Sequence, residues 1–404
     1  MGRAKKAVMS ASPTMSHAWR SLALLASASA LSATVPRTAA PPGIEVHGRP
    51  SSTLALPFPE LKELVGGAGR ARSVWDAVRA GEEPLDSDLV TIGARRALLA
   101  CGATRFVPAT LAETHVAKDG TTKLLVRLAD GLAVEAVLIP HPTRPRTTLC
   151  VSSQVGCDRG CRFCATARMG LVRQLTADEI LAQFAIAARV ARESDAMPPL
   201  TNIVFMGMGD AGRNVDHVKA AATSLVDGDK FRMARSKITI STVGPSPEAF
   251  AALADADGML AWSIHAADED LRRKLVPSSR HPLPELRRGL IDALEARPAR
   301  RRTLMLAATL IRDVNDSDDD AAKLAEFIGP IVDAAGKCNV DLIPCNPTDH
   351  TDFESPSTER VLAYAAKIRE LEPRVHVATR LQRGDDESAA CGQLLVSRKP
   401  ELVA

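Results

Sequence analysis

Short apolar runs alternate with helical stretches along the chain from residue 147 onward. The runs have the length of buried strands, and the stretches between them repeat apolar residues at helical spacing. One helix is expected to begin after Thr176, because Thr176 followed by Glu179 forms the pattern of a capping box. Regular alternation predicts an α/β fold with a parallel sheet and right-handed crossovers, either open or closed into a barrel. The predicted strands are 147–152, 201–206, 237–241, 259–264, 303–310, 339–343 and 375–379.

The preceding part of the chain, residues 45–142, has a different pattern and is predicted to be a small accessory domain. It begins with the end of a proline-rich linker, 36–59, and continues with two helical patterns. Two further apolar runs flank Asp130-Gly131, a pair that favours a tight hairpin turn. The expected elements are helices at 73–80 and 88–99 and a hairpin of 123–128 with 132–139.

The first 44 residues contain no Asp or Glu and are rich in Ala and Ser, with scattered basic residues. An acid-poor segment of this kind is typical of an organelle transit peptide. Residues 21–33 also resemble the apolar core of a signal peptide, so a bipartite leader to a plastid is one interpretation and a mitochondrial leader is another. We predict import into an organelle. The alternative is a tail without a targeting role, on a cytoplasmic protein.

Composition excludes several classes of protein. With 404 residues, 46% of them apolar, the chain can form a sizeable core. No stretch reaches about 18 consecutive apolar residues, so we expect no ordinary membrane-spanning helix and no membrane partner. Aromatic residues make up 3%, too few for a broad platform on which nucleic-acid bases stack.

The formal net charge of +3, from 51 basic and 48 acidic residues, suggests an acidic partner such as nucleic acid. The charge is unevenly spread, however. Residues 1–44 carry five basic residues and no acidic ones, so the rest of the chain has a formal charge of −2. Any surface that binds nucleic acid must therefore be a local patch. Two basic clusters are candidates, although either could equally be a solvated helix face: Arg297 with Arg300, Arg301 and Arg302, and Arg272 with Arg273 and Lys274.

Four of the eight cysteines lie within fifteen residues, which indicates a metal or redox site rather than a disulfide scaffold. Cys157, Cys161 and Cys164 have the spacing C-x3-C-x2-C and follow a predicted strand. Three thiolates on one loop can bind three irons of a four-iron cluster and leave the last iron open. Two alternatives remain: a zinc site with Cys150 as fourth ligand, and three cysteines that are simply buried.

Glycines and polar residues gather where the predicted strands end. Because the carboxyl ends of parallel strands lie at one edge of a sheet or barrel, these residues are expected to face one ligand-binding mouth with the cysteine loop. Each also has a plainer interpretation: a tight turn for the glycines, a core histidine, and a turn-forming asparagine before Pro347. The residues are Gly207, Gly209, Asp210, Ser241, Ser263, Ile264, His265 and Asn346.

The cysteine motif, with Phe163 before its last cysteine, resembles that of the radical S-adenosylmethionine superfamily. The wider string Leu149-Cys-Val-Ser-Ser-Gln-Val-Gly-Cys157 is more specific and is similar to the adenine carbon-2 RNA methyltransferases of that superfamily. Further matches follow in the family's order, and the resemblance covers about residues 135–394. They are Val204-Phe-Met-Gly-Met-Gly-Asp210, Ser263-Ile-His265, Leu275-Val-Pro277, Val314-Asn-Asp-Ser317, Ile343-Pro-Cys-Asn-Pro347 and Arg383-Gly-Asp-Asp-Glu-Ser-Ala-Ala-Cys391-Gly-Gln-Leu394.

The resemblance implies a partial (β/α)6 barrel over residues 143–382 and a C-terminal segment, 383–404. It also implies two cofactors. A four-iron, four-sulfur cluster would be held by Cys157, Cys161 and Cys164, and two molecules of S-adenosylmethionine would be used per turnover. The residues that the resemblance places against S-adenosylmethionine are Gly209, Asp210, Ser241, Ser263, Ile264, His265 and Asn346.

Three further residues match the family's catalytic positions. Cys391 matches the methyl carrier, whose sulfur is methylated by one S-adenosylmethionine before a radical from the second removes a hydrogen from that methyl group. Cys150 matches the residue that attacks Cys391, releases the methylated RNA and leaves a transient disulfide. Glu135 matches the proton acceptor. The implied partners are large-subunit ribosomal RNA, transfer RNA in many members, and an electron donor such as flavodoxin or ferredoxin; the expected state is a monomer.

The chain departs from the family pattern at two places. Asp210-Ala211 stands where the family has Glu-Pro, and Cys345 stands where an aromatic residue is common. Because Asp is one methylene shorter than Glu, its contact with the amino group of the cofactor is expected to differ from that in the family. Three other functions are kept as alternatives: methylation of adenine carbon 8, another radical S-adenosylmethionine enzyme such as a glycyl-radical activase, and a zinc-bearing RNA-binding module. The match around Cys391 argues against the activase, and the broad likeness favours carbon 2.

Overall fold

The computed structural model describes residues 53–100, 105–349, 351–380 and 382–396, so the predicted leader, 1–44, lies outside the described residues. The helices are α1 (Phe58–Leu64), α2 (Ala68–Arg79), α3 (Ile92–Ala100), α4 (Ala177–Glu193), α5 (Val215–Val226), α6 (Pro247–Leu253), α7 (Glu269–Leu275), α8 (Leu283–Glu295), α9 (Asp318–Ala334) and α10 (Thr358–Leu371). The strands are β1 (Ala109–Val116), β2 (Thr122–Leu128), β3 (Ala133–Pro140), β4 (Thr147–Cys150), β5 (Gln154–Gly156), β6 (Leu171–Gln174), β7 (Leu200–Phe205), β8 (Ile238–Thr242), β9 (Met259–Ser263), β10 (Thr303–Leu310), β11 (Lys337–Pro344) and β12 (His376–Thr379).

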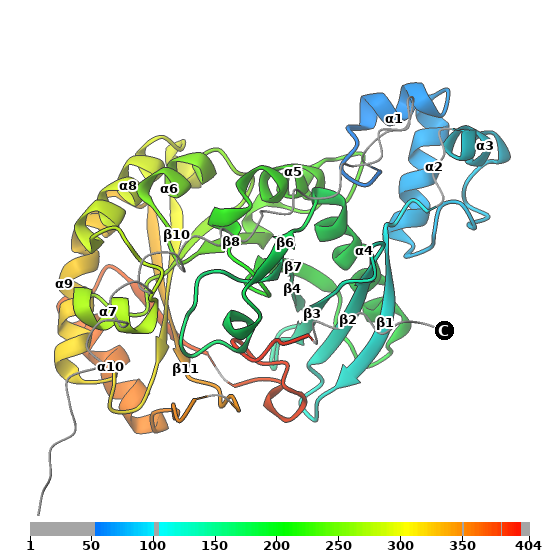
Figure 1. Ribbon diagram of the computed structural model, residues 1–404. Helices are drawn as coiled ribbons and strands as arrows, with labels where there is room; N and C mark the ends of the chain where they lie inside the picture. Colours follow the sequence, from blue (N-terminus) through cyan, green and yellow to red (C-terminus); the bar gives the residue numbers. More distant parts are fainter. Residues whose placement is uncertain (1–52, 101–104, 350, 381, 397–404) are drawn as a thin grey trace, which may run out of the picture. The chain divides into compact units, whose positions relative to one another are not determined.

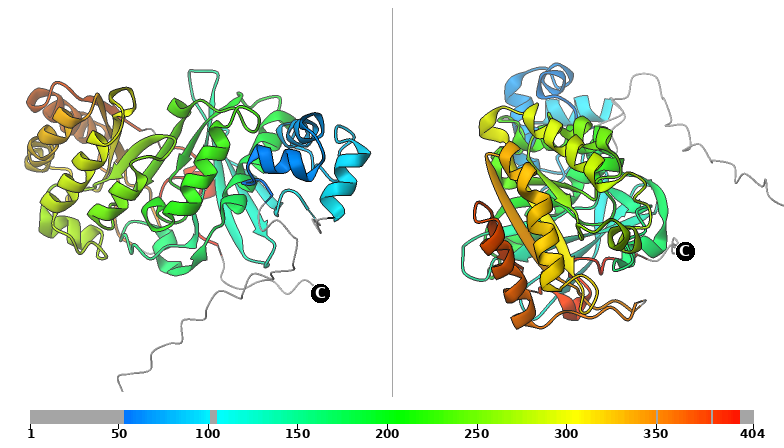
Figure 2. Two further views of the ribbon diagram at one scale, coloured as in Figure 1. Left: turned by 90° about the horizontal axis from the view of Figure 1, so that it is seen from above. Right: turned by 90° about the vertical axis from the view of Figure 1, so that its left-hand side faces the viewer.

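A ten-stranded sheet has the order β1-β2-β3-β4-β7-β8-β9-β10-β11-β12. From β4 to β12 every neighbouring pair is parallel, and helices α4, α5, α6, α8, α9 and α10 make the crossovers. These helices cover the outer face of the curved sheet (Figure 1, Figure 2). Because β1 and β12 are at opposite ends of the strand order, the barrel is open. This confirms the predicted partial barrel of β/α units.

The predicted parallel strands all form, with ends within about two residues of those expected. Strands β8 and β10 are buried along nearly their whole length, and such strands are recognisable because they carry continuous apolar runs. The capping box before α4 also forms. The Thr176 hydroxyl accepts a hydrogen bond from the Glu179 amide at 3.2 Å, and the Glu179 carboxylate accepts one from the Thr176 amide at 2.9 Å.

The predicted hairpin is β2 with β3, and its turn lies at Asp130-Gly131, where Gly131 has a φ of 83°. The hairpin belongs to the large sheet, because β3 also pairs antiparallel with β4. The sheet therefore continues across residue 142, the predicted end of the accessory domain. Strand β1 pairs with the outer side of the hairpin and is not predicted from the sequence. Most of its residues are partly or fully exposed, so it lacks an apolar pattern.

The accessory helices α1, α2 and α3 contact the barrel through Trp75 of α2. The indole packs edge-on against Phe106 and against Phe231, which follows α5, at centroid distances of 6.0 and 5.0 Å. Lys230 lies over the same ring at 4.9 Å and donates to the carbonyl oxygen of Leu56 at 3.0 Å. Helix α1 begins inside the predicted linker, which is therefore shorter than expected at its end. Among the described residues, no helix is long and apolar enough to cross a membrane.

Candidate active site

One pocket lies at the carboxyl ends of the parallel strands, where the sequence predicts a ligand-binding mouth. Strands β4, β7, β8 and β9 each bring at least one predicted residue to it, and the cysteine loop and the C-terminal segment close it from the other side. The predicted site residues that line the pocket are Cys150, Cys157, Cys161, Cys164, Gly209, Asp210, Ser241, Ser263, His265 and Cys391. Glu135, Ile264 and Asn346 do not line it.

The three cysteines of the C-x3-C-x2-C motif lie on the loop that follows β5. Cys157 and Cys161 are buried and Cys164 is half-buried. Burial raises the pKa of the Cys157 thiol to about 12 and that of Cys161 well above its ordinary value, so neither thiol ionises by itself at neutral pH. A bound metal supplies the positive charge that such thiolates need. The three thiols lie on one loop and line one pocket, an arrangement that suits a metal centre.

Two kinds of metal centre use cysteine ligands in different ways. A mononuclear zinc site needs ligands that converge on one point about 2.3 Å from each sulfur. A four-iron cluster instead takes each thiolate on a different iron. The three cysteines around one pocket therefore fit the cluster.

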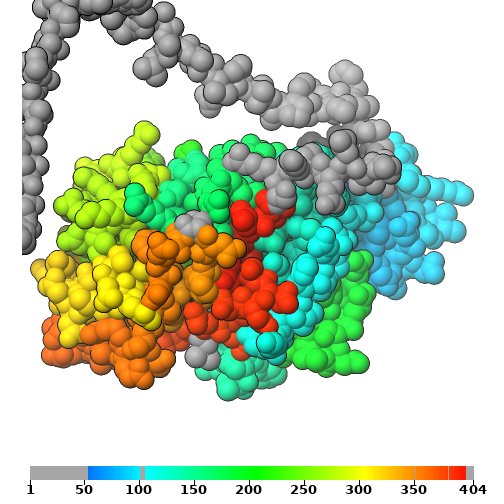
Figure 3. Space-filling view, turned by 60° about the horizontal axis from the view of Figure 1, so that its bottom comes forward, coloured from blue at the N-terminus to red at the C-terminus, as the bar shows by residue number. Residues whose placement is uncertain are grey.

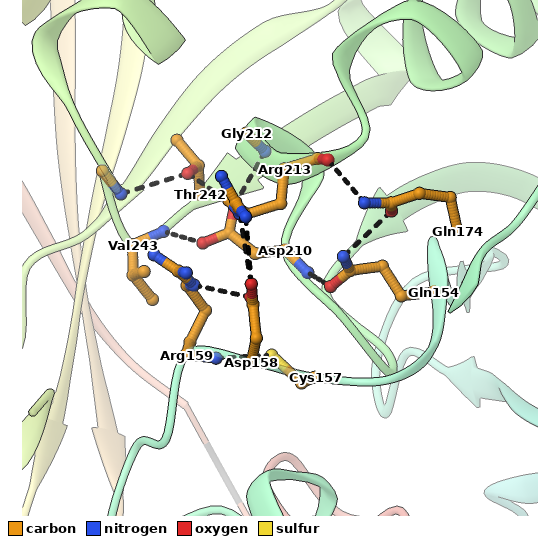
Figure 4. Close-up of polar contacts among 11 residues, drawn as sticks. Gln154, Cys157, Asp158, Arg159, Gln174, Asp210, Gly212, Arg213, Thr242 and Val243 are labelled. Atoms are coloured by element: carbon orange, nitrogen blue, oxygen red, sulfur yellow. Dashed lines mark hydrogen bonds and ion pairs between the residues drawn. The ribbon is translucent and has the colours of Figure 1, made fainter. Parts of the chain in front are cut away.

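The Asp210 carboxylate is held by internal donors (Figure 4). It accepts hydrogen bonds from the Gly212 amide at 2.7 Å, the Thr242 hydroxyl at 2.6 Å and the Val243 amide at 3.0 Å. Burial raises its pKa above the ordinary value even though these donors stabilise the ionised form. A carboxylate offers about four acceptor positions, so one remains for a cofactor ammonium group.

The two glycines after β7 are required for different reasons. A side chain at Gly207 would meet the backbone of Val151 at 2.8 Å, so this glycine allows two backbone segments to pack. Gly209 has a φ of 100° and lines the pocket. A Cβ there would lie 2.6 Å from Gln154, whose amide oxygen accepts from the Asp210 amide at 2.9 Å. Gly207 lines the pocket as well, so both glycines allow a close approach to a ligand, and Gly207 also serves packing.

His265 follows β9 with a φ of 61° and is buried. Its Nδ1 accepts a hydrogen bond from the Thr309 amide at 3.2 Å, which places the proton of the neutral ring on Nε2. Burial, together with Arg272, lowers the pKa of the imidazole to about 3, so the ring stays neutral. Phe163 packs against it at 4.7 Å between ring centroids. The two serines at neighbouring strand ends, Ser241 and Ser263, share a hydrogen bond of 3.1 Å.

Asn346 and Ile264 lie next to the pocket rather than in its lining. The Asn346 side-chain amide donates to the backbone carbonyl of Cys391 at 2.9 Å, while its Oδ1 is buried without a partner among the described residues. Such an orphaned acceptor is the kind of group that a cofactor donor completes. The Ile264 side chain is fully buried in the core, so only its backbone can face a ligand.

Cys391 lies on the C-terminal segment, which Figure 3 shows between the cyan hairpin and the orange end of the barrel. It is exposed, whereas Cys150 at the end of β4 is buried, and both line the pocket. The segment is tied to the cysteine loop, because the Ala165 amide donates to the Gly392 carbonyl at 2.7 Å. Burial, and then the nearby Cys391 thiolate, raise the pKa of Cys150 to about 12, and Arg380 acts in the opposite direction.

Glu135 lies on β3 and is buried. Its carboxylate accepts a hydrogen bond from the Leu395 amide at 2.8 Å and pairs with Lys123 at 3.5 Å. It thus contacts the C-terminal segment that carries Cys391, although it does not line the pocket itself. Burial raises its pKa above the ordinary value, against the effect of Lys123. A carboxylate with a raised pKa is a better proton acceptor near neutral pH.

Sequence reasoning missed several residues that support the site. Ser152 and Gln183 join β4 to α4, and Gln154 connects the cysteine loop to the glycine turn. Arg380, at the end of β12, lines the pocket beside Cys391 and pairs with Asp341 at 2.9 Å. Ser152 and Gln154 stand inside the string that carries the family resemblance, which was a usable signal. Nothing in the local sequence around Gln183 or Arg380 distinguishes them.

Each of the two predicted basic clusters contains one buried arginine. Arg272 is buried and donates to the carbonyl oxygens of Ile264 and Val243. Arg297 is also buried and donates to the carbonyl oxygens of Ala256 and Gly258. Its cluster precedes β10 and lies at the amino end of that strand, away from the carboxyl ends. The expectation of a surface cluster is therefore wrong for both of these arginines, because each satisfies buried carbonyl groups.

Comparisons with known proteins agree with this geometry. The family model of the radical SAM superfamily matches residues 151–325. The chain is 42% identical over 278 residues to the dual-specificity RNA methyltransferase RlmN of Geotalea uraniireducens, covering 68% of this chain and 75% of that protein. It is 40% identical over 285 residues to a probable RNA methyltransferase of Sorangium cellulosum, covering 70% and 68%. The crystal structure of a radical SAM methyltransferase from Sphaerobacter thermophilus is 37% identical, with a TM-score of 0.75, covering 85% of this chain and 98% of that one.

The barrel and its cysteine loop define an enzyme of the radical S-adenosylmethionine class, which uses a four-iron, four-sulfur cluster and S-adenosylmethionine. Within that class, the chain belongs to the RNA methyltransferase family whose members are named RlmN. The family, the fold class and the enzyme class predicted from the motifs are thereby confirmed. The roles of individual residues stay predictions.

Proposed function

We propose that this methyltransferase transfers a methyl group to carbon 2 of an adenine in large-subunit ribosomal RNA, with transfer RNA as a second substrate. The observation that carries the proposal is that two thiols, Cys150 and Cys391, line the pocket that also contains the cysteine triad. An enzyme that only cleaves S-adenosylmethionine needs no such pair. The name of the relatives, dual-specificity RNA methyltransferase, supports an RNA substrate of two kinds.

The residues present can hold both cofactors. Cys157, Cys161 and Cys164 would bind the cluster, and the polar groups at the strand ends would bind S-adenosylmethionine. When bound, the cofactors supply a radical that can remove hydrogen from an unactivated methyl group. Such a radical route is needed because carbon 2 of adenine has no acidic proton. The chain's part is to position them and to exclude water, and the buried apolar residues around Cys161 serve this purpose.

Three residues of the chain would then carry the transfer. Cys391 holds the methyl group on its sulfur, and its exposed position allows RNA to reach it. Glu135 takes the proton lost from the adenine. Cys150 attacks the Cys391 sulfur, which releases the methylated RNA and forms a disulfide that an external reductant reopens. The burial of Cys150 keeps it protonated until that step, and Arg380 favours its ionisation.

Partners and location complete the proposal. A one-electron protein donor of the flavodoxin or ferredoxin class would reduce the cluster, and the chain would act as a monomer. Residues 1–44 would direct it to a plastid or mitochondrion, because they are free of acidic residues and rich in Ala and Ser. A fusion of these residues to a fluorescent protein tests the location, and a cytoplasmic signal would contradict it.

Mass spectrometry of nucleosides tests the reaction. Undermodified ribosomal RNA is incubated with the reduced, cluster-loaded enzyme and S-adenosylmethionine, and then digested to nucleosides. We expect 2-methyladenosine, and the Cys391→Ala variant, which lacks the proposed carrier, should form none. A product that contains only 8-methyladenosine would overturn the assigned position. A repeat with transfer RNA tests the second substrate.

A further inference from the structure

A basic loop lies at the open side of the active-site pocket. It connects β3 to β4 over residues 141–146, with the sequence His-Pro-Thr-Arg-Pro-Arg. His141 and Arg146 line a groove together with Arg380 and Arg383 from the other side. Groove and pocket are continuous, because both are lined by Cys391, Arg380, Ile139 and Val204. An extended ligand in the groove can thus place one of its groups beside Cys391.

The positive charges of the loop lack carboxylate partners. Arg380 pairs with Asp341 at 2.9 Å, and Arg383 pairs with Asp119 at 2.6 Å. Among the described residues, neither Arg144 nor Arg146 is within ion-pair distance of a carboxylate, and the Arg146 Nε is buried without a hydrogen-bond partner. Partial desolvation and then the charges of Arg146, Arg144 and Arg383 lower the pKa of His141. Several like charges in one place favour an anionic ligand.

The loop holds these arginines in a defined geometry. The Nδ1 of His141 accepts hydrogen bonds from the amides of Thr143 and Arg144, both at 3.2 Å. The His141 amide donates to the Arg146 carbonyl at 2.9 Å, which closes the base of the loop. Two prolines restrict the backbone further. A loop that is already ordered loses less conformational entropy when it binds.

We propose that Arg144 and Arg146 form a phosphate-binding arm that holds the RNA backbone in the groove, so that the target adenine enters the pocket beside Cys391. This proposal rests on the proposed function for its substrate, and it adds the surface that binds that substrate. Guanidinium groups suit phosphates because they donate paired hydrogen bonds. The arm, rather than the clusters that contain the buried Arg272 and Arg297, is the proposed site of RNA contact.

The test compares RNA binding and turnover in wild-type enzyme and in the double variant Arg144→Gln/Arg146→Gln. The probe is an unmodified large-subunit ribosomal RNA transcript, and its Kd is measured by filter binding over a series of salt concentrations. We expect Kd to rise about tenfold or more at physiological salt, since two charge-assisted contacts are lost. The slope of log Kd against log salt should decrease by about one for each arginine. In the methylation assay KM should rise while kcat stays close to the wild-type value.

The matched control is Arg300→Gln/Lys337→Gln, which removes the same charge from exposed residues at the amino ends of β10 and β11. It should leave the salt slope unchanged. If the arm variant keeps the wild-type slope and KM while wild-type enzyme forms 2-methyladenosine, the arm is refuted and the function stands. If both variants lose equal affinity, the arm is also refuted. If binding depends on the arm but wild-type enzyme forms no methyladenosine, the proposed reaction fails and the arm stands.

Discussion

At the scale of residues, the two thiols of the proposed transfer differ in their surroundings. Burial raises the pKa of the Cys150 thiol, at the end of a strand, to about 12 and also raises that of the Cys391 thiol, although Cys391 as a residue is exposed on the C-terminal segment. A methyl carrier has to be reachable by RNA, whereas a resolving thiol has to stay unreactive until the carrier is loaded. The difference in exposure suits that order of events.

Replacement of the resolving thiol should trap the intermediate. In Cys150→Ala the methylated RNA can no longer be released from Cys391, so a covalent protein–RNA adduct should accumulate. Denaturing gel electrophoresis after reaction with labelled RNA detects it. The control is Cys338→Ala, a buried cysteine of β11 that does not line the pocket. Continued turnover without an adduct in the Cys150 variant would exclude disulfide resolution.

The shortened acidic residue after β7 makes a second prediction. Asp210→Asn replaces one carboxylate oxygen by an NH2 group and removes the negative charge, so S-adenosylmethionine should bind about tenfold more weakly. Calorimetry on the cluster-loaded protein measures the affinity. Thr242→Val removes only the hydroxyl that donates to Asp210, and its effect should be smaller. An unchanged affinity in Asp210→Asn would rule out contact with the cofactor.

At the scale of elements, helix α4 supports the site through one buried amide side chain. Gln183 accepts from the Ser152 amide at 2.9 Å and donates to the Ser152 carbonyl at 3.0 Å. This pair replaces the ladder hydrogen bonds that β4 lacks once its strand ends. The helix thereby holds the segment between Cys150 and the cysteine loop.

Removal of that amide should loosen the segment. Gln183→Met keeps the length of the side chain but leaves two buried backbone groups of Ser152 unpaired, at a cost of about 2 to 4 kcal/mol. Hydrogen exchange should show faster exchange of the amides in 151–156. The control is Arg189→Met, which changes a partly exposed residue of the same helix and should have little effect on exchange. Equal protection in both variants would mean that α4 does not order this segment.

The elements also show which secondary structures can be predicted from patterns in a sequence. The strands β7 to β11 carry apolar runs, with β8 and β10 buried along nearly their whole length, and were predicted within about two residues of their ends. Strand β1 is mostly exposed and α1 occupies a proline-rich stretch, so neither carries an apolar period. Strands β5 and β6 are too short to be recognised by periodicity. Detection thus depends on burial and length rather than on importance for the site.

At the scale of the whole molecule, the cysteine triad should determine the metal content. Anaerobically purified wild-type protein should contain about four irons and four sulfides per chain, the composition of the cluster that three thiolates hold. The triple variant Cys157→Ala/Cys161→Ala/Cys164→Ala should lose both. Elemental analysis with a sulfide assay measures them, and Cys338→Ala is the control. One zinc per chain in place of iron would identify a different centre.

Runs of charged residues, unlike the cysteine motif, do not predict from the sequence which residues surround the site. The basic clusters at Arg272 and Arg297 stand out in the sequence, but both arginines turn inward to satisfy carbonyl groups. The loop 141–146 is less conspicuous, and its Arg146 lines the groove. A run of charges does not reveal burial, because burial depends on contacts between distant segments.

The sequence by itself determined the chemistry and the class of fold. Alternating apolar periods indicate the parallel barrel, and the cysteine spacing indicates the cluster, because both depend on residues close together in the chain. Tertiary structure alone decided how the remaining groups meet. Glu135 holds the amide of Leu395, and Asn346 holds the carbonyl of Cys391. These contacts join residues that are far apart in sequence. No local pattern of apolar residues predicts them, because they form only when the chain packs into its folded structure.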